Sequence, residues 1–226
     1  MRRNYIASSC LVLLLAAAAA FGQGFWTRKV FPNWTDEEAR TMATNSPWAK
    51  DVTITTGARG SSERDTTEIG VSELEAASRA NASTGQTIKL NIAWLTSLPI
   101  KQAMLKERFA LGGDLAANAQ KIMEAQEEVY AIGLSGLPTD MVEDVIHNIE
   151  QVKQSSLNPA KKPTIALADL DFQPRGRTTD VLFLFPRTDP IAVEDTEVEV
   201  ILKLGTFEAR RKFNLKDMVY NGKLEL

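Results

Sequence analysis

The chain has 226 residues, of which 44% are hydrophobic and 24% are charged, a composition typical of a globular protein and not of a disordered or fibrous one. It carries 26 Lys and Arg against 29 Asp and Glu, a formal net charge of −3. This acidic balance argues against a general nucleic-acid-binding protein.

The first 22 residues have the pattern of a cleaved secretory signal. Arg2 and Arg3 form a short basic start, an apolar run covers Ile6–Ala20, and Ala20-Phe21-Gly22 provides the small residues that a signal peptidase reads. The apolar run is shorter than the roughly 20 residues of a membrane-spanning helix. We therefore predict export to the periplasm or the extracellular space; an uncleaved N-terminal anchor is the alternative.

Cleavage changes the charge and the thiol content of the chain. Arg2 and Arg3 are removed with no acidic residue, so 24 of the 26 basic residues remain against 29 acidic ones, a net charge of −5. Cys10 is the only cysteine of the sequence, and it also lies in the leader. The mature chain is therefore expected to have no disulfide, no thiol nucleophile and no thiolate metal ligand. It is also expected to have no transmembrane segment.

The mature chain starts with an aromatic stretch, since three of the four tryptophans lie between residues 25 and 48. Thr35 and Glu38 form a capping box, which predicts a short helix from Asp36 to about Ala43. Bulky rings on both sides of a short helix indicate a segment that packs on the main body. A carbohydrate-stacking surface is the alternative interpretation.

Two stretches with alternating apolar residues, Asp51–Thr56 and Thr87–Leu95, predict a pair of strands. Residues 57–86 between them are rich in polar residues and glycine and contain few apolar ones. Such a composition predicts a flexible insertion. The middle of the chain then predicts helices over residues 97–109, 114–127 and 140–154 and a short strand over 129–134.

The stretch Asp180–Pro186 is apolar on both alternating faces of a strand. A strand without a polar face has to be covered on both sides, so we place it in the middle of a sheet. Further strands are expected over 163–172, 196–204 and 207–215. The sequence therefore predicts a single α+β domain over residues 23–226, with a mostly antiparallel sheet centred on residues 180–186 and helices at 98–126 and 140–154 covering one face.

The last two strands predict a hairpin with a definite register. Gly205-Thr206 has the sequence of a two-residue type II′ turn, which makes the numbers of paired residues add up to 411. Glu199 then faces Lys212 on one side of the hairpin, whereas apolar residues meet on the other side. Arg211 is the exception, because it lies opposite Val200 on the apolar side. It is expected to reach past the sheet edge or to find a carboxylate.

Few residues are candidates for chemistry. His147, the only histidine, is expected on the solvated face of its helix, away from any catalytic pocket. Asp169 and Asp171 form a D-x-D pair that suits a hydrolase or a divalent cation, although a polar strand end beside a turn has the same pattern. No metal site or cofactor is predicted.

The basic cluster Arg210, Arg211, Lys212 and Lys216 is the candidate binding surface of this acidic protein. It suits an anionic partner or lipid head groups. The alternative is that Arg210 and Lys212 pair with Glu199 and Glu208 within the hairpin.

Two stretches carry a resemblance to a family: Trp34–Lys50, with its WTDEEAR and NSPWAK motifs, and Phe183–Leu226, which begins FLFPRTDP and ends KFNLKDMVYNGKLEL. They resemble an uncharacterised family of exported bacterial proteins that has no assigned activity. The resemblance implies export and transfers no site residue.

Together these observations predict a non-catalytic exported protein of the cell envelope that binds an unknown protein or an anionic envelope component. A hydrolase that uses Asp169 and Asp171 is one alternative, in which case both carboxylates should line a pocket. A lipid-apposed accessory protein that uses the basic edge Arg210–Lys216 is the other.

Overall fold

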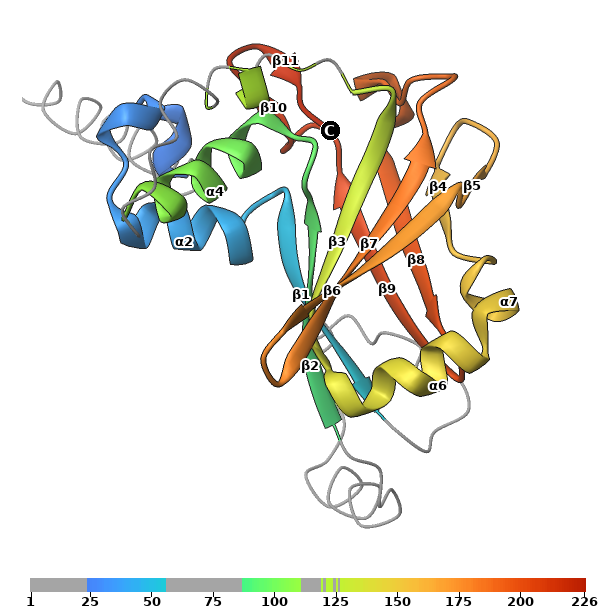
Figure 1. Ribbon diagram of the computed structural model, residues 1–226. Coiled ribbons are helices and arrows are strands. Elements are labelled where there is room, and N and C mark those ends of the chain that lie inside the picture. Colours follow the sequence, from blue (N-terminus) through green and yellow to red (C-terminus); the bar gives the residue numbers. More distant parts are fainter. Residues whose placement is uncertain (1–23, 56–86, 111–118, 120, 124, 126) are drawn as a thin grey trace, which may run out of the picture.

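The computed structural model describes residues 24–55, 87–110, 119, 121–123, 125 and 127–226 (Figure 1). Over these residues the chain has an α+β fold built on two antiparallel sheets, which confirms the predicted class. The leader, the insertion at 57–86 and most of the helix expected at 114–127 lie outside the described residues.

The larger sheet has five strands among the described residues, in the order β1-β2-β3-β7-β6, and all its neighbours are antiparallel. Its strands are β1 (Ala49–Thr55), β2 (Thr87–Trp94), β3 (Val129–Pro138), β6 (Asp169–Arg175) and β7 (Thr178–Pro186). The pairing of β1 with β2 confirms the two strands expected on either side of the insertion. An internal position for the apolar stretch 180–186 is also confirmed, since β7 lies between β3 and β6; the middle strand of the five is β3.

The second sheet has the order β5-β4-β8-β9. It consists of β4 (Ser156–Pro159), β5 (Ile165–Ala166), β8 (Glu197–Leu204) and β9 (Phe207–Asn214), and β10 (Val219–Tyr220) and β11 (Lys223–Leu224) form a separate small hairpin. The β8–β9 register is the predicted one, with Glu199 opposite Lys212 and Arg211 opposite Val200. Gly205 has φ 70, as the first residue of a type II′ turn requires.

The inner faces of the two sheets bury the core. Val181, Phe183 and Phe185 of β7 are fully buried, whereas Leu182 and Leu184 on the outer face are only half-buried. The rings of Trp94 on β2 and Phe213 on β9 meet edge to face at 5.9 Å, which joins the two sheets. Each sheet therefore covers the apolar face of the other.

Helix α2 (Asp36–Thr44) begins at the predicted capping box, where the Glu38 N–H donates to Thr35 Oγ1 at 3.1 Å and the Thr35 N–H donates to Glu38 Oε2 at 2.8 Å. The aromatic residues around it pack on the main body, as expected: Trp34 and Trp48 are buried. Short 3₁₀ turns at η2 (Phe25–Thr27) and η3 (Phe31–Asn33) precede the helix.

The helices lie at opposite ends of the sheets, so they do not cover one face together as predicted (Figure 1). Helix α4 (Leu98–Ala110) packs beside α2, whereas α6 (Val142–His147) and α7 (Ile149–Val152), which follow η4 (Thr139–Met141), lie at the β8–β9 end. The second sheet occupies the face that we had assigned to helices. No described helix is long and apolar enough to cross a membrane.

Three expectations about the strands and helices are wrong in detail. The helix expected over 140–154 is interrupted at Asn148. Ile146, whose position four residues after Val142 would place it on the apolar face of an unbroken helix, is 51% exposed. Residues 173–179, which separate the strands expected over 163–172 and 180–186, contain only a two-residue turn at Gly176-Arg177, because Arg175 pairs directly with Thr178. The strand expected over 163–172 is divided into β5 and β6, which belong to different sheets.

Candidate functional site

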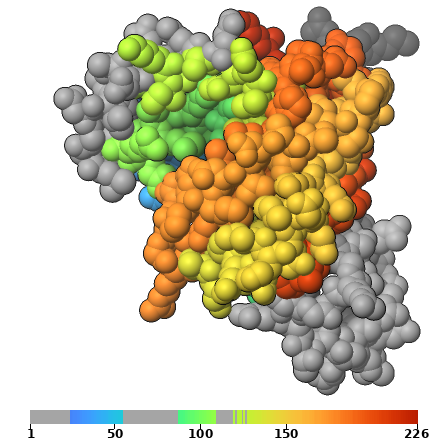
Figure 2. Space-filling view, turned by 45° about the vertical axis from the view of Figure 1, so that its right-hand side comes forward, coloured from blue at the N-terminus to red at the C-terminus, as the bar shows by residue number. Residues whose placement is uncertain are grey.

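Asp169 and Asp171 lie on the outer side of β6, at the edge of the larger sheet, and both are exposed. In Figure 2 the orange segment that contains β6 and β7 is an open part of the surface, between α4 and β3 in green and α6 and α7 in yellow. Asp169 Oδ1 accepts a hydrogen bond from the N–H of Leu170 at 2.8 Å, and Asp171 Oδ2 accepts one from Gln173 Nε2 at 3.3 Å. Neither carboxylate lines either of the two clefts described below.

His147 is exposed at the C-terminal end of α6, as predicted. Its Nδ1 lies 2.8 Å from the backbone oxygen of Glu143, one turn earlier. Over the described residues no group of three or more His, Cys, Asp or Glu side chains is arranged to hold a metal ion.

The predicted basic cluster is largely neutralised by the carboxylates of its own hairpin. Arg210 Nη2 lies 2.8 Å from Glu208 Oε1, and Arg210 Nη1 lies 3.5 Å from Glu199 Oε1. Lys212 Nζ lies 3.1 Å from Glu197 Oε1, diagonally across the hairpin. Burial opposes ionisation of Glu208, but hydrogen bonds from Lys203 and Arg210 outweigh it and lower the pKa of this carboxyl group.

Arg211 and Lys216 complete this cluster but lie apart from Arg210 and Lys212. Arg211 is half-buried on the opposite side of β9, at the edge where β9 meets β1. There its charge contributes to lowering the pKa of Asp51, for which the hydrogen bond from Lys89 is the largest cause. Lys216 is exposed in the turn that follows β9. The four cations therefore do not form one continuous basic surface.

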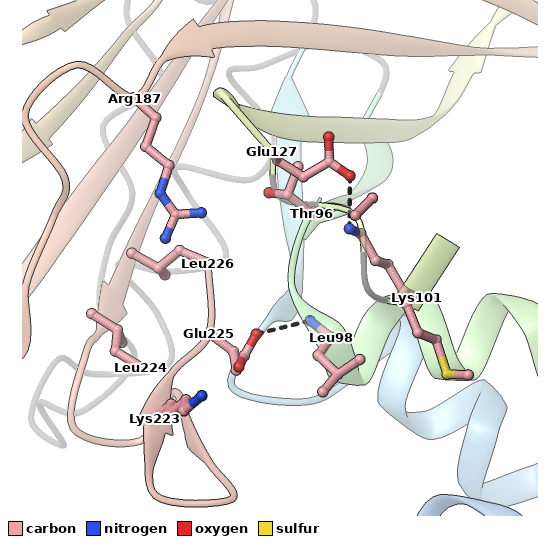
Figure 3. Close-up of a pocket in the computed structure, with 11 residues that line it drawn as sticks. Thr96, Leu98, Lys101, Glu127, Arg187, Lys223, Leu224, Glu225 and Leu226 are labelled. Atoms are coloured by element: carbon pink, nitrogen blue, oxygen red, sulfur yellow. Dashed lines mark hydrogen bonds and ion pairs between the residues drawn. The ribbon is translucent and has the colours of Figure 1, made fainter. Parts of the chain in front are cut away.

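A cleft of about 480 Å³ lies at the end of the larger sheet where β2 ends, β3 begins and β7 ends (Figure 3). Its wall is formed by the start of α4, the residues before β3, the residue after β7 and the last residues of the chain, with Leu98, Leu224 and Leu226 as its apolar part. Lys101, Arg187 and Lys223 provide positive charge, and Glu127 and Glu225 provide negative charge.

Both acidic side chains of this cleft already have partners. Lys101, only 8% exposed, places Nζ 2.7 Å from Glu127 Oε1. Glu225 Oε2 accepts a hydrogen bond of 3.3 Å from the N–H of Leu98 at the start of α4, where a helix favours negative charge. The two contacts, dashed in Figure 3, leave Arg187 and Lys223 as cations of the cleft without a carboxylate partner among the described residues.

Arg187 is half-buried, and its guanidinium group points into the cleft (Figure 3). It lies over the ring of Tyr130, with the guanidinium carbon 5.0 Å from the ring centroid. Burial raises the pKa of Tyr130, against smaller lowering contributions that include the charge of Arg187. The phenol therefore stays neutral near neutral pH and does not compensate the charge of Arg187.

The loop after β7 holds Arg187 in this position. The N–H of Ile191 donates to the Tyr130 hydroxyl at 2.7 Å, and Lys162 Nζ donates to Asp189 Oδ1 and to the Pro190 carbonyl, both at 2.6 Å. Asp189 therefore forms an ion pair with Lys162. A loop fixed at these points presents Arg187 in a preorganised orientation, which lowers the entropic cost of binding.

A half-buried arginine with five N–H donors and no carboxylate partner is suited to bind a carboxylate or phosphate group. Arg187 is not among the residues that the sequence patterns indicate as candidates. The available signal was weak: a single arginine directly after a buried strand, between Pro186 and Pro190.

Comparisons of the chain with models of protein families, with curated proteins and with solved structures found no match.

Proposed function

We propose that this protein is a non-catalytic, exported protein of the cell envelope that binds a partner by an anionic group held at Arg187. The leader pattern of residues 1–22 and the resemblance described above support export. The observation that carries the binding proposal is the half-buried guanidinium group of Arg187, which is stacked on Tyr130 and faces a cleft without an ion-pair partner among the described residues.

The cost of burial supports this assignment. A partly buried cation loses hydration, and proteins usually compensate the loss with a carboxylate or with hydrogen bonds. Lys101 in the same cleft is compensated by Glu127, whereas Arg187 has a cation–π contact with Tyr130. An anionic group of a partner would complete the site by a bidentate, charge-assisted pair.

The alternatives from the sequence have less support. The exposed positions of Asp169 and Asp171 weigh against the hydrolase. The ion pairs of Arg210 and Lys212 weigh against a lipid-apposed protein that uses the edge Arg210–Lys216.

The test is an NMR titration of the ¹⁵N-labelled protein, expressed from Met1 and purified after export, with sodium succinate and with sodium phosphate at low ionic strength. We expect saturable shifts at the cleft residues. Arg187→Met should weaken binding by about tenfold or more, because a charge-assisted hydrogen bond contributes about 1.5–3 kcal/mol.

Arg177→Met is the matched control. Arg177 is exposed in the β6–β7 turn, so its loss removes the same charge from the protein without changing the cleft. Equal weakening by both substitutions would show a nonspecific charge effect and overturn the proposal. Absence of saturable shifts at the cleft would overturn it as well.

A further inference from the structure

A second cleft, of about 380 Å³, adjoins the Arg187 cleft. The two share their walls: Met123 lines both, the adjacent α4 residues Lys101 and Gln102 line one each, and the β10–β11 hairpin contributes to both. The remaining wall of the second cleft is the aromatic start of the described chain, residues 26–32. One extended ligand that occupies the first cleft can therefore reach the second.

Aromatic rings of fixed orientation line the second cleft. Trp26 and Phe31 are half-buried there, whereas Trp34 and Trp48 behind them are fully buried. The indole ring of Trp26 meets Phe25 edge to face at 5.2 Å and Trp48 at 6.0 Å. Gly24 lies against the six-membered part of the ring, since a Cβ atom on Gly24 would lie 2.2 Å from Trp26 Cη2. The part of the ring that is open to the cleft provides a rigid surface on which the C–H groups of a sugar can pack.

Gln102 provides a polar group in the same cleft. It is only 8% exposed, and its Oε1 accepts a hydrogen bond of 2.9 Å from the Tyr220 hydroxyl group. Burial raises the pKa of Tyr220, so this hydroxyl group stays protonated and remains a donor. No hydrogen bond joins the carboxamide Nε2 to an acceptor among the described residues, and Gln102 lines the cleft, so this N–H group can donate to a ligand hydroxyl or carbonyl oxygen.

We infer that the second cleft binds a sugar ring, and that the ligand of the two clefts together is an acidic saccharide with its carboxylate at Arg187. This inference rests on the proposed function for the position of the carboxylate. Aromatic side chains beside a fixed amide donor suit a ring whose C–H faces are apolar and whose edges carry hydroxyl groups. A polyanion fits less well, because Lys101 and Lys29 are already paired with Glu127 and Glu38.

The experiment is isothermal titration calorimetry of the exported protein with a galactose trisaccharide that carries a single carboxylate, on one terminal galacturonate, and with the neutral galactose trisaccharide of the same linkage. We expect the acidic trimer to bind about tenfold or more tightly than the neutral one, because only the acidic trimer pairs with Arg187. Arg187→Met should remove this difference, whereas Arg177→Met, at the exposed β6–β7 turn, should preserve it.

Two substitutions probe the second cleft. Trp26→Ala should weaken binding of both trimers, and Trp26→Phe should restore most of it. Gln102→Glu keeps an oxygen acceptor for Tyr220 and removes the amide donor, so it should also weaken both trimers while the fold, followed by circular dichroism, is retained.

The outcomes separate the two proposals. If succinate binds at Arg187 but neither trimer depends on Trp26 or Gln102, the saccharide inference is wrong and the proposed function stands. If both trimers bind equally and Arg187→Met changes nothing, the anionic site is wrong and so is the acidic class of ligand. Failure of both trimers to bind, or tighter binding of a nucleotide that depends on Trp26, also overturns the inference.

Discussion

Arg187 and Arg211 are both half-buried arginines, but their surroundings differ. Arg211 lies opposite Val200 in the β8–β9 hairpin and acts electrostatically on Asp51 at the neighbouring strand edge. Arg187 lies on an uncharged ring and faces a cleft whose carboxylates are engaged by other groups. The position of nearby acids, and not the residue type, decides which of the two is available to a ligand.

The solvent-exposed position of the His147 side chain can be tested by substitution. His147→Gln should change the free energy of unfolding by less than about 0.5 kcal/mol, because its side chain is exposed and makes only a local contact with the Glu143 carbonyl. Urea unfolding followed by circular dichroism measures the change. The control is Val145→Ala on the same helix, where Val145 is fully buried.

Val145→Ala removes two buried methyl groups and should cost about 1.5 kcal/mol or more, at roughly 0.8 kcal/mol for each group. A loss of similar size in His147→Gln would contradict the exposed position of the imidazole.

At the scale of the element, the helix expected over 140–154 is interrupted at Asn148, where another segment of the fold packs against it. The Asn148 side chain donates from Nδ2 to the carbonyl of Asp144 at 2.7 Å, a contact that competes with regular helix formation. The β8–β9 turn lies directly against this point, since a Cβ atom on Gly205 would lie 3.2 Å from Asn148 Cβ. The spacing of apolar residues within 140–154 does not predict this contact with the β8–β9 turn.

The two-residue turns of the β6–β7 and β8–β9 hairpins provide a matched pair of glycines. Gly176 and Gly205 have φ 68 and 70, so alanine at either position costs about 1–2 kcal/mol of backbone strain. Around Gly176 no atom lies within 4 Å of the added Cβ, whereas at Gly205 it would also lie 3.3 Å from the Asp144 carbonyl oxygen.

We therefore expect Gly205→Ala to lower the free energy of unfolding more than Gly176→Ala, as measured by urea denaturation of both variants. An equal loss of free energy of unfolding in the two variants would mean that α6 and α7 shift to accommodate the added methyl group. Their packing against the turn would then contribute little to stability.

At the scale of the whole molecule, two sheets share one core, and the candidate site lies at the end of the larger one. The order β2-β3-β7 brings together the end of β2, the start of β3 and the end of β7, and the chain after β9 returns to the same place. Trp48 Nε1 fixes this return by donating to the Glu225 carbonyl at 2.8 Å. The site is therefore assembled from segments that are far apart in the sequence.

The predicted cleavage of the leader on export can be tested with the whole chain. Expression from Met1 in a secreting bacterial host should yield a protein cleaved near Gly22, without Cys10, because the leader has the pattern that a signal peptidase reads. Intact mass spectrometry of the exported fraction decides the point. A mass that includes Cys10 would support the uncleaved anchor, and replacing Ala20 with a bulky residue should block cleavage if the prediction is right.

The sequence by itself determined the features whose partners are near neighbours in the chain. The capping box of Thr35 and Glu38, the alternation of β1 and β2 and the register of the β8–β9 hairpin all follow from local spacing, because turn geometry and strand periodicity act over a few residues. The exposed position of His147 follows from helical periodicity in the same way.

Only the tertiary structure decided the division into two sheets, the place of the helices and the site at Arg187. One strand pattern is compatible with several sheet orders, so it does not reveal that β7 pairs with β3 while β8 pairs with β4. The availability of Arg187 depends on where the described carboxylates lie in space. Glu127 and Glu225 come close to it through the fold and are engaged by Lys101 and by the N–H of Leu98, contacts that no local pattern encodes.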